Sequence, residues 1–380
     1  MYACLPDGCG SGKDTGFCGM YPLWKMCECV SEKGVETWNE IKTFVELYKI
    51  DEKIKKHLKK ILALHTGGTI SMSANDLGEV STNKENPLLD SRFIDDNIEL
   101  TNESVLNKPS EHITPADMLK IQKRVQKAES EGYDGIVITH GTDTLEETAY
   151  FLDLTLPNHL PIVLTGAMRS SNEIGSDGVY NFQSAILTAA ADESTDKGVL
   201  VVMNDEIHTA RYVTKTHTTN VDTFRTPTFG PIGLVGKRGI HYFQELIQQT
   251  VVPIDHLVSN VYLLKAYAGM PASLIECLDQ KSTKGLVIEG LGAGNMPLET
   301  VAAIKKLLDD QIPVVMVSRC YNGVAEPIYD YPGGGIDLER MGVTFCQGLN
   351  GPKARIKLLI GISAGLTGQT LRDYISNAVS

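Results

Sequence analysis

Positive charge is scarce in this sequence relative to negative charge. Lys and Arg together number 35, against 47 Asp and Glu, so the formal net charge is -12 at pH 7. Proteins that bind nucleic acid collect the phosphates with a basic surface, which this composition does not favour. We therefore expect no nucleic-acid partner.

Long hydrophobic runs are also missing. No apolar stretch approaches the roughly 20 residues that a helix needs to cross a bilayer. The N-terminal residues lack the apolar segment of a secretory signal peptide. Hydrophobic residues nevertheless make up 42% of the chain and charged residues 22%, as in a globular protein. We expect no membrane partner and a cytoplasmic location.

Cysteines at regular metal-binding spacing are absent. Five of the eight cysteines lie in the first thirty residues, at Cys4, Cys9, Cys18, Cys27 and Cys29. A zinc site or a disulfide framework stays open for this segment, although an odd number of cysteines without a C-x-x-C pair favours neither. The other three, Cys277, Cys320 and Cys346, are expected to be small buried side chains. We predict no metal and no cofactor.

Composition and periodicity divide the 380 residues into four parts. Residues 1–58 form a Cys-rich extension whose second half has the apolar spacing of a helix, and this extension either docks on the body or is poorly ordered. Two domains follow, over residues 59–240 and 257–380. A linker over residues 241–256 joins them, at the end of a stretch where Gly and Pro interrupt the alternation of strands and helices.

The body alternates apolar runs with helical patterns. Strands are predicted from Ile61 and over residues 136–139, 161–165, 199–203, 261–264, 286–289 and 314–317. Helices are predicted from Thr114, from Thr144, and over residues 178–191 and 300–309. Continuous apolar strands separated by helices indicate a parallel sheet covered on both faces. The predicted fold is therefore α/β, with a larger N-terminal domain whose parallel or mixed sheet is flanked by helices and a smaller C-terminal α/β domain.

Two of the predicted strands end in glycine turns that carry hydroxyl groups. The first strand runs into Thr66-Gly67-Gly68-Thr69, and the strand over 136–139 runs into His140-Gly141-Thr142-Asp143-Thr144. Glycine lets the backbone turn tightly and approach a ligand closely. Open α/β sheets usually bind ligands at the carboxyl ends of their strands, so both turns are candidates for one site.

These two segments resemble the two signature stretches of the bacterial-type asparaginase family. Gly166-Ala167-Met168-Arg169 and Val213-Thr214-Lys215-Thr216 resemble further stretches of that family in the same order, and the resemblance extends over about residues 59–380. It implies hydrolysis of the side-chain amide of L-asparagine to L-aspartate and ammonia, without a cofactor. It also implies a homodimer or homotetramer.

The resemblance assigns catalytic roles to four residues. Thr66 would attack the amide carbonyl and form an acyl-enzyme, while Thr142 would act with Asp143 and Lys215. A neutral lysine can accept the proton of a hydroxyl, and a carboxylate can hold the resulting ammonium. The structural alternatives stay open, since threonines in turns often satisfy backbone amides and an Asp before a helix often caps it.

Further residues would bind the substrate. Ser110 and Glu111 align with the family's pair that holds the amino-acid end of the substrate, and Thr142 and Asp143 would contribute as well. Asn295 would lie in a segment through which a neighbouring subunit completes the pocket, and Glu326 would be a further acid from that neighbour. As structural alternatives, Glu111 is an exposed loop acid and Asn295 a turn residue.

The sequence departs from the family in the loop after Thr66. Many members carry a tyrosine there that contacts the nucleophile, whereas no tyrosine lies between Ile70 and Arg92. The polar residues of this loop still suit a hinged lid.

Three other functions remain as alternatives. Glu111 would be compatible with a broader glutaminase-asparaginase. A tRNA-dependent amidotransferase subunit would carry an N-terminal extension, but a strand-rich one. A non-catalytic amino-acid sensor on the same fold would have no need to keep Thr66, Thr142, Asp143 and Lys215 together. We predict an asparaginase.

Overall fold

The computed structural model describes residues 2–3, 21–22, 58–75, 80–82, 88, 96–157, 159–246, 250–278 and 280–376. Contacts divide the chain into two compact units, residues 1–58 and 59–380. The described elements of the first unit are β1 (Tyr2–Ala3) and β2 (Tyr21–Pro22), which pair antiparallel. The five N-terminal cysteines and the helix expected in this extension lie outside the described residues.

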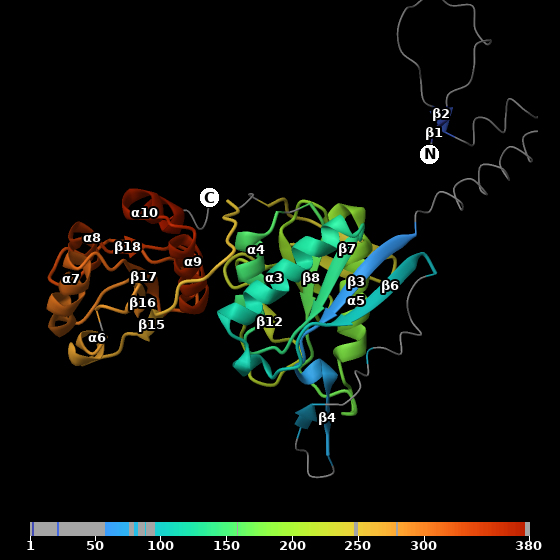
Figure 1. Cartoon of the computed structure of the whole chain (residues 1–380), viewed down its shortest axis with the longest axis horizontal. Helices are drawn as coiled ribbons and strands as arrows, with labels where there is room; N and C mark the ends of the chain where they lie inside the picture. The colour runs from blue at the N-terminus through green and yellow to red at the C-terminus, as the bar shows by residue number, and fades with distance from the viewer. Residues whose placement is uncertain are drawn as a thin grey trace, which may run out of the picture. The chain divides into compact units, whose positions relative to one another are not determined.

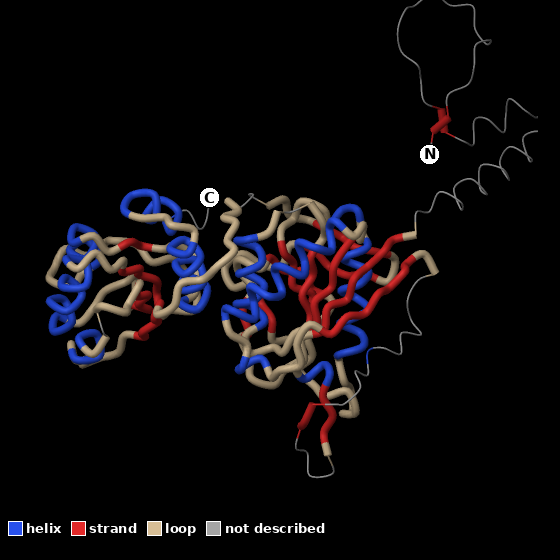
Figure 2. Tube along the Cα trace, in the orientation of Figure 1, coloured by secondary structure: helices blue, strands red, loops and turns tan. Residues whose placement is uncertain are grey.

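The second unit contains an eight-stranded mixed sheet (Figures 1 and 2). In spatial order its strands are β14 (Gly239–Tyr242), β13 (Gly233–Gly236), β10 (Glu206–Thr209), β9 (Val199–Met203), β8 (Ile162–Thr165), β7 (Gly135–Thr139), β3 (Lys59–His65) and β6 (Ile98–Ser104). The strands from β9 to β6 are parallel, and β10, β13 and β14 continue the sheet in antiparallel pairs. The predicted α/β fold with a parallel or mixed sheet is confirmed.

Helices cover both faces of this sheet. They are α3 (Pro115–Ser130), α4 (Leu145–Thr155) and α5 (Gly178–Ala190). Neighbouring residues of a strand point to opposite faces. Accordingly, Leu62 and Leu64 of β3 pack in one core cluster with α3 and α4, while Ile61 and Ala63 pack in a second cluster with α5. The central positions of β3, β7, β8 and β9 are apolar because both of their faces are buried.

Helix α3 begins where the sequence predicts. The Thr114 hydroxyl accepts a hydrogen bond from the Asp117 amide, and the Asp117 carboxylate accepts one from the Thr114 amide. This reciprocal pair satisfies two backbone donors that would otherwise be unpaired at the helix start. Pro115 occupies the first helical position, where no intrahelical donor is needed.

The Gly- and Pro-rich stretch after residue 222 is more structured than the sequence indicates. It contains β12 (Phe224–Arg225), β13 and β14, and the last two form a hairpin in which Gly236 pairs with Gly239. The predicted linker over residues 241–256 therefore begins inside β14, which ends at Tyr242.

Short elements complete the N-terminal part. They are the 3-10 helices Thr69–Ser71, Ser110–His112 and Asp192–Ser194, the hairpin of β4 (Met72–Ala74) and β5 (Val80–Thr82), and β11 (Thr214–Lys215). Strand β11 pairs antiparallel with β12 as a separate two-stranded sheet.

The C-terminal part is built on a four-stranded parallel sheet. Its strands are β15 (Val261–Lys265), β16 (Gly285–Gly290), β17 (Val314–Ser318) and β18 (Thr344–Phe345). Its helices are α6 (Ser273–Glu276), a 3-10 turn at Leu298–Thr300, α7 (Val301–Asp309), α8 (Gly335–Met341), α9 (Gly351–Ser363) and α10 (Gly368–Ser376). Helix α9 packs against α4 of the larger sheet as well as against β15 and β16.

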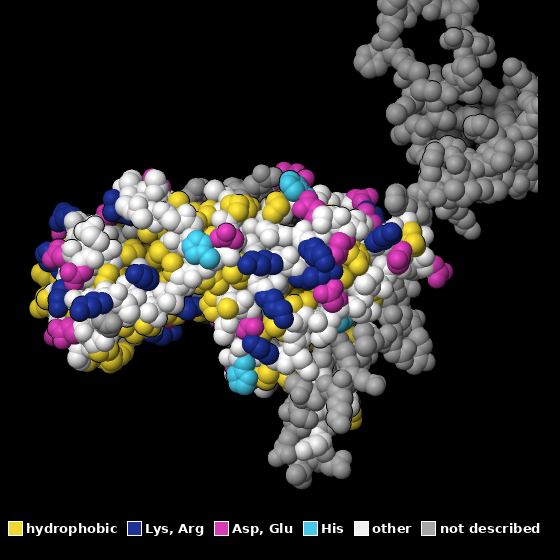
Figure 3. Space-filling model, in the orientation of Figure 1, with side chains coloured by type: hydrophobic (Ala, Val, Ile, Leu, Met, Phe, Trp, Pro, Cys, Tyr) yellow, Lys and Arg dark blue, Asp and Glu magenta, His cyan; other side chains and the backbone are white. Residues whose placement is uncertain are grey.

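The expectations for cysteine burial, surface charge and membrane-spanning helices can be compared with the structure. Cys346 is buried as predicted, but Cys277 and Cys320 are exposed, because they lie on a short helix end and in a loop rather than inside a sheet. On the face shown in Figure 3, Lys and Arg side chains are interspersed with Asp and Glu. No helix in the described part of the chain is long and apolar enough to span a membrane.

Candidate active site

The turns after β3 and β7 pack backbone against backbone. A Cβ atom on Gly68 would lie 2.3 Å from the Gly141 Cα, and one on Gly67 would lie 2.5 Å from the Lys108 carbonyl oxygen. Gly67 and Gly68 also have positive φ values of 103° and 86°, which L side chains rarely adopt. Glycine at position 68 therefore lets the two hydroxyl-bearing turns meet at one edge of the sheet, and glycine at position 67 lets the first turn approach the loop after β6.

Thr66 follows β3 directly and is 1% exposed. Its amide donates to the Thr139 carbonyl at 3.1 Å, which extends the pairing of β3 with β7 by one residue. Its hydroxyl donates to the same carbonyl oxygen at 2.9 Å. The hydroxyl is thus oriented by the neighbouring strand, and its oxygen retains lone pairs.

The side chain of Lys215, from β11, contacts the turn that follows β7. The Lys215 Nζ lies 2.9 Å from the Thr142 Oγ1 and 2.6 Å from the Asp143 Oδ1. The lysine side chain is 16% exposed, whereas the Asp143 side chain is 60% exposed. One amine therefore contacts a hydroxyl and a carboxylate together, an arrangement that can move a proton between the amine and the hydroxyl while the carboxylate balances the ammonium.

Ser110 is built into the same group. Its Oγ accepts a hydrogen bond from the Asp143 amide at 3.2 Å, and its carbonyl accepts one from the Thr144 hydroxyl at 2.7 Å. The neighbouring Glu111 carboxylate lies 3.5 Å from the Ser110 Oγ and is exposed. The structure thus places the predicted residues Ser110, Glu111, Thr142, Asp143 and Lys215 in one continuous cluster.

His140 stabilises the turn after β7 through hydrogen bonds, a role that is not among those predicted from the sequence. Its Nδ1 donates to the Gly141 carbonyl at 2.8 Å, so its Nε2 accepts from the Thr148 hydroxyl at 2.9 Å. Complete burial lowers the pKa of His140 to about 4, which keeps the ring neutral near pH 7. The signal for this residue was its place in the second signature stretch, but a histidine there could equally have been a ligand-binding group.

Known proteins match both parts of the second unit. The asparaginase N-terminal domain matches residues 60–248, and the glutaminase/asparaginase C-terminal domain matches residues 260–375. The chain belongs to the asparaginase family. The resemblance read from the two glycine turns is therefore confirmed.

Individual relatives cover most of the chain. An L-asparaginase of Bacillus licheniformis is 32% identical over 80% of this chain and 95% of its own length. A probable L-asparaginase of Deinococcus radiodurans is 36% identical over 85% of this chain and 98% of its own length. The crystal structure of a probable cytoplasmic L-asparaginase from Campylobacter jejuni superposes with a TM-score of 0.75 at 32% identity, covering 83% of this chain and 99% of that one.

Asn295 and Glu326 lie on neighbouring segments in the C-terminal part of this asparaginase-family chain. Asn295 closes the turn after β16, where its Oδ1 accepts from the Gly335 amide at 3.1 Å, and the Glu326 amide donates to the Ala293 carbonyl at 2.9 Å. Among the described residues, neither side chain forms a hydrogen bond or ion pair with the Thr142 cluster. Their predicted place in a pocket completed by a neighbouring subunit stays a prediction.

The described part of the loop after Thr66 includes the 3-10 helix Thr69–Ser71 and, after it, the hairpin of β4 and β5. Its base is fixed to the loop after β8, because the Ser171 hydroxyl donates to the Met72 carbonyl at 2.8 Å and lies 3.0 Å from the Ser73 hydroxyl. Residues 76–79 and 83–87, which belong to the predicted lid, lie outside the described residues.

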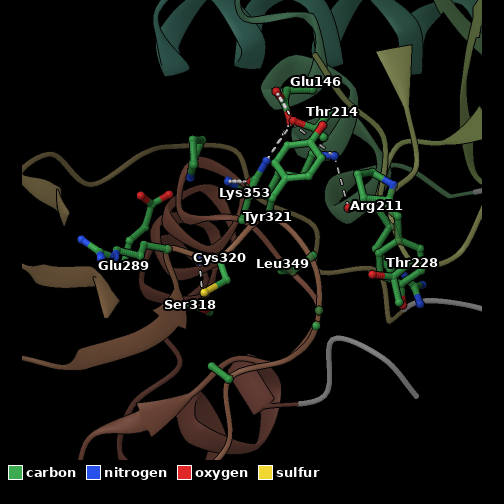
Figure 4. A pocket seen from close by; sticks show the side chains of 18 of the residues that line it. Glu146, Arg211, Thr214, Thr228, Glu289, Ser318, Cys320, Tyr321, Leu349 and Lys353 are labelled. Carbon is green, nitrogen blue, oxygen red and sulfur yellow. Dashed lines mark hydrogen bonds and ion pairs between the residues drawn. The ribbon is translucent and has the colours of Figure 1, made fainter. Parts of the chain in front are cut away.

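A pocket lies next to the segments that carry Thr142 and Lys215, and residues of both the N-terminal and the C-terminal part line it (Figure 4). Glu146, Thr214, Tyr321 and Lys353 line it, and the first two belong to the segments that carry Thr142 and Lys215. Thr66 and Thr142 are not among the residues that line this pocket. No group of three or more metal-binding side chains occurs within the described ranges.

Proposed function

We propose that the protein is an L-asparagine amidohydrolase that releases L-aspartate and ammonia. The observation that carries the proposal is the contact of the Lys215 amine with both the Thr142 hydroxyl and the Asp143 carboxylate, at 2.9 Å and 2.6 Å. Membership of the asparaginase family and the names of the relatives support the same substrate.

In this proposal Thr66 is the nucleophile. Its Oγ attacks the side-chain amide carbon, and the nitrogen leaves as ammonia after taking up a proton. Lys215, acting through the Thr142 hydroxyl, accepts the proton of the nucleophile and returns it to the leaving nitrogen. Water then hydrolyses the acyl-enzyme and restores the Thr66 hydroxyl.

The substrate is held by its amino-acid end. We propose that the carboxylates of Asp143 and Glu111 bind the substrate ammonium, because both side chains are exposed and lie in the same cluster as Thr142. Ser110 fixes the Asp143 backbone and completes this end of the site. Replacing Asp143 by Asn should therefore raise KM as well as lower kcat, since it would weaken ground-state binding and lysine pairing together.

We further propose a homodimer or homotetramer of two-domain subunits. Residues 59–240 and 257–380 would form the domains, residues 241–256 would connect them, and Asn295 and Glu326 would complete the pocket of a neighbouring copy. Among the described residues, the absence of a hydrogen bond or ion pair from Asn295 or Glu326 to the Thr142 cluster is compatible with this arrangement. Light scattering combined with activity measurement tests it, and a fully active monomer would contradict it. The predicted cytoplasmic location is part of the same proposal and is tested by cell fractionation.

A broader glutaminase-asparaginase is the second candidate. Glu111 is compatible with it, because its exposed carboxylate would bind the ammonium that L-asparagine and L-glutamine share. Ammonia release from L-asparagine, D-asparagine and L-glutamine, measured side by side, distinguishes the two. A kcat/KM for L-glutamine within about tenfold of that for L-asparagine would favour the broader activity, because tenfold corresponds to only about 1.4 kcal/mol of discrimination.

A further inference from the structure

Lys215 lies on a strand that is poorly anchored by its own sheet. Strand β11 contains two residues, Thr214 and Lys215, which pair with the two residues of β12. The pairing extends by one step, because the Thr216 amide donates to the Thr223 carbonyl at 2.8 Å. It belongs to neither the eight-stranded nor the four-stranded sheet. A two-stranded pair of this length is not stable by itself, so other contacts must hold the backbone from which the Lys215 side chain projects.

Glu146 supplies the first of these contacts. It lies in the first turn of α4, three residues after Asp143, and is 9% exposed. Its Oε1 accepts hydrogen bonds from the Thr214 hydroxyl at 2.9 Å and from the Lys215 amide at 3.3 Å. A single carboxylate oxygen thus ties β11 to the helix that follows the Thr142 turn.

Helix α9 of the C-terminal part holds the other oxygen of Glu146. Asn350 is the N-cap of α9, and its Oδ1 accepts from the Lys353 amide at 3.1 Å. Its Nδ2 donates to the Glu146 Oε2 at 2.9 Å. The same nitrogen lies 3.4 Å from the Thr214 Oγ1. The amide of Asn350 therefore uses its oxygen for the helix and its nitrogen for the Glu146 carboxylate.

Lys353 holds the segment before β11. It is 1% exposed, and its Nζ donates to the carbonyls of Arg211, at 3.2 Å, and Val213. The same Nζ lies 3.7 Å from the Glu146 Oε2 (Figure 4). Burial lowers the pKa of Lys353 to about 8, although Glu146 and Asp153 oppose the shift. An ammonium in such a place must be paired and hydrogen-bonded, so its geometry is fixed.

We propose that Glu146, Asn350 and Lys353 form a clamp that positions Lys215 for proton transfer. The clamp holds three consecutive residues, through the Val213 carbonyl, the Thr214 hydroxyl and the Lys215 amide. Two of its three members come from α9, so the orientation of the catalytic lysine depends on the C-terminal part of the chain. In the proposed reaction the three act through Lys215 and not on the reacting atoms; they are positioning residues, and their role in turnover rests on the proposed function.

An exchange of hydrogen-bonding roles tests the clamp. Asn350→Asp keeps the oxygen that caps α9 but places a carboxylate against the Glu146 Oε2. Glu146→Gln keeps one acceptor oxygen but places an amide against the Asn350 Nδ2 or against the donors of β11. In the double variant, Gln at 146 can donate to Asp at 350, the oxygen facing β11 is retained, and one negative charge remains for Lys353. Glu299→Gln, an exposed acid of the C-terminal part, is the matched control.

Each single variant should lower kcat for L-asparagine by about tenfold or more, the scale of one hydrogen bond to a charged group, while KM stays within about twofold. The double variant should recover kcat to within about threefold of the parent, and the control should not differ from it, because coupling is confined to residues in contact. Hydrogen exchange of residues 211–216, measured by mass spectrometry, should be faster in the single variants and restored in the double variant.

A purely structural role would give a different pattern. The single variants would then lose thermal stability while the folded protein kept its kcat, and that result would overturn the clamp, as would a double variant no better than the worse single one. If the parent protein released no ammonia from L-asparagine, the proposed function would be wrong. The exchange measurement would then decide the clamp separately, since rescue in the double variant supports it and unchanged exchange contradicts it.

Discussion

Replacing Lys215 by Arg separates proton transfer from charge balance at the centre of the site. Lys215 Nζ contacts the Asp143 carboxylate at 2.6 Å and the Thr142 hydroxyl at 2.9 Å. Arginine can keep the ion pair with Asp143, because its guanidinium binds carboxylates at least as well as an ammonium does. It cannot accept a proton from Thr142, because a guanidinium does not deprotonate in proteins.

The expected loss follows from what arginine cannot do. Removing a general base typically costs about 100-fold to 10,000-fold in rate, so we expect Lys215→Arg to lower kcat at least about 100-fold. This corresponds to about 2.7 kcal/mol in the activation free energy. The KM for L-asparagine should change much less, because the pairing of Asp143 is retained.

The assay is steady-state ammonia release at several pH values, with thermal unfolding measured in parallel. Lys305→Arg is the matched control, since it makes the same change in an exposed ion pair with Asp309 at 2.8 Å. Rescue of Lys215→Ala by a small primary amine would add direct support for a base. A Lys215→Arg variant within a few fold of the parent, with the same pH profile, would refute the proton-acceptor assignment.

Three further predictions concern the nucleophile, the extension and the buried histidine. Thr66→Ala and Thr142→Ala should each abolish ammonia release without unfolding the protein. The double variant should be little less active than either single variant, because the two hydroxyls act in one step, and additive losses of activity would contradict this. Deletion of residues 1–58 should leave turnover unchanged, and a folded but inactive truncation would be the contrary result. The pKa of His140 falls from 6.5 to about 4 on folding, so the unfolded chain binds more protons between these two pH values and the folded protein loses stability as the pH falls from 6.5 to 4. The free energy of unfolding should therefore decrease by roughly 3 kcal/mol between pH 7 and pH 4, as measured by denaturant unfolding. The decrease should be smaller in His140→Gln.

The parallel part of the larger sheet could be predicted because its strands carry their own signal. Strands β7, β8 and β9 are runs of buried, mainly apolar residues, and each lies within one residue of its predicted bounds. Burial on both faces leaves no room for polar residues, so the sequence marks these strands plainly. The capped start of α3 is equally local, since its hydrogen bonds join residues three apart.

The remaining strands of that sheet depend on pairing that the sequence does not mark. Strand β6 lies at the edge and alternates between exposed and half-buried residues, including Glu99 and Glu103. Strands β13 and β14 contain glycine, which weakens an isolated strand signal. Strands β6 and β13 form by pairing with β3 and β10 across intervening chain, and β14 is added through its hairpin with β13.

The same distinction applies to the site. Thr66, Thr142, Asp143 and Lys215 follow from motifs that the family shares, whereas Asn350 and Lys353 follow only from the packing of α9 against α4. In the sequence, Lys353 is an ordinary lysine near the start of a helix. Its burial and its contacts with the segment before Lys215 arise from tertiary structure alone.

The most direct test of the proposed function is ammonia release from L-asparagine by the purified full-length protein, run beside the Thr66→Ala variant. The parent should release one ammonia and form one L-aspartate per L-asparagine consumed, and the variant should do neither while retaining the parent's thermal unfolding profile. Release of no ammonia by a folded parent, or equal release by both proteins, would contradict the assignment of this site as a threonine-dependent asparaginase.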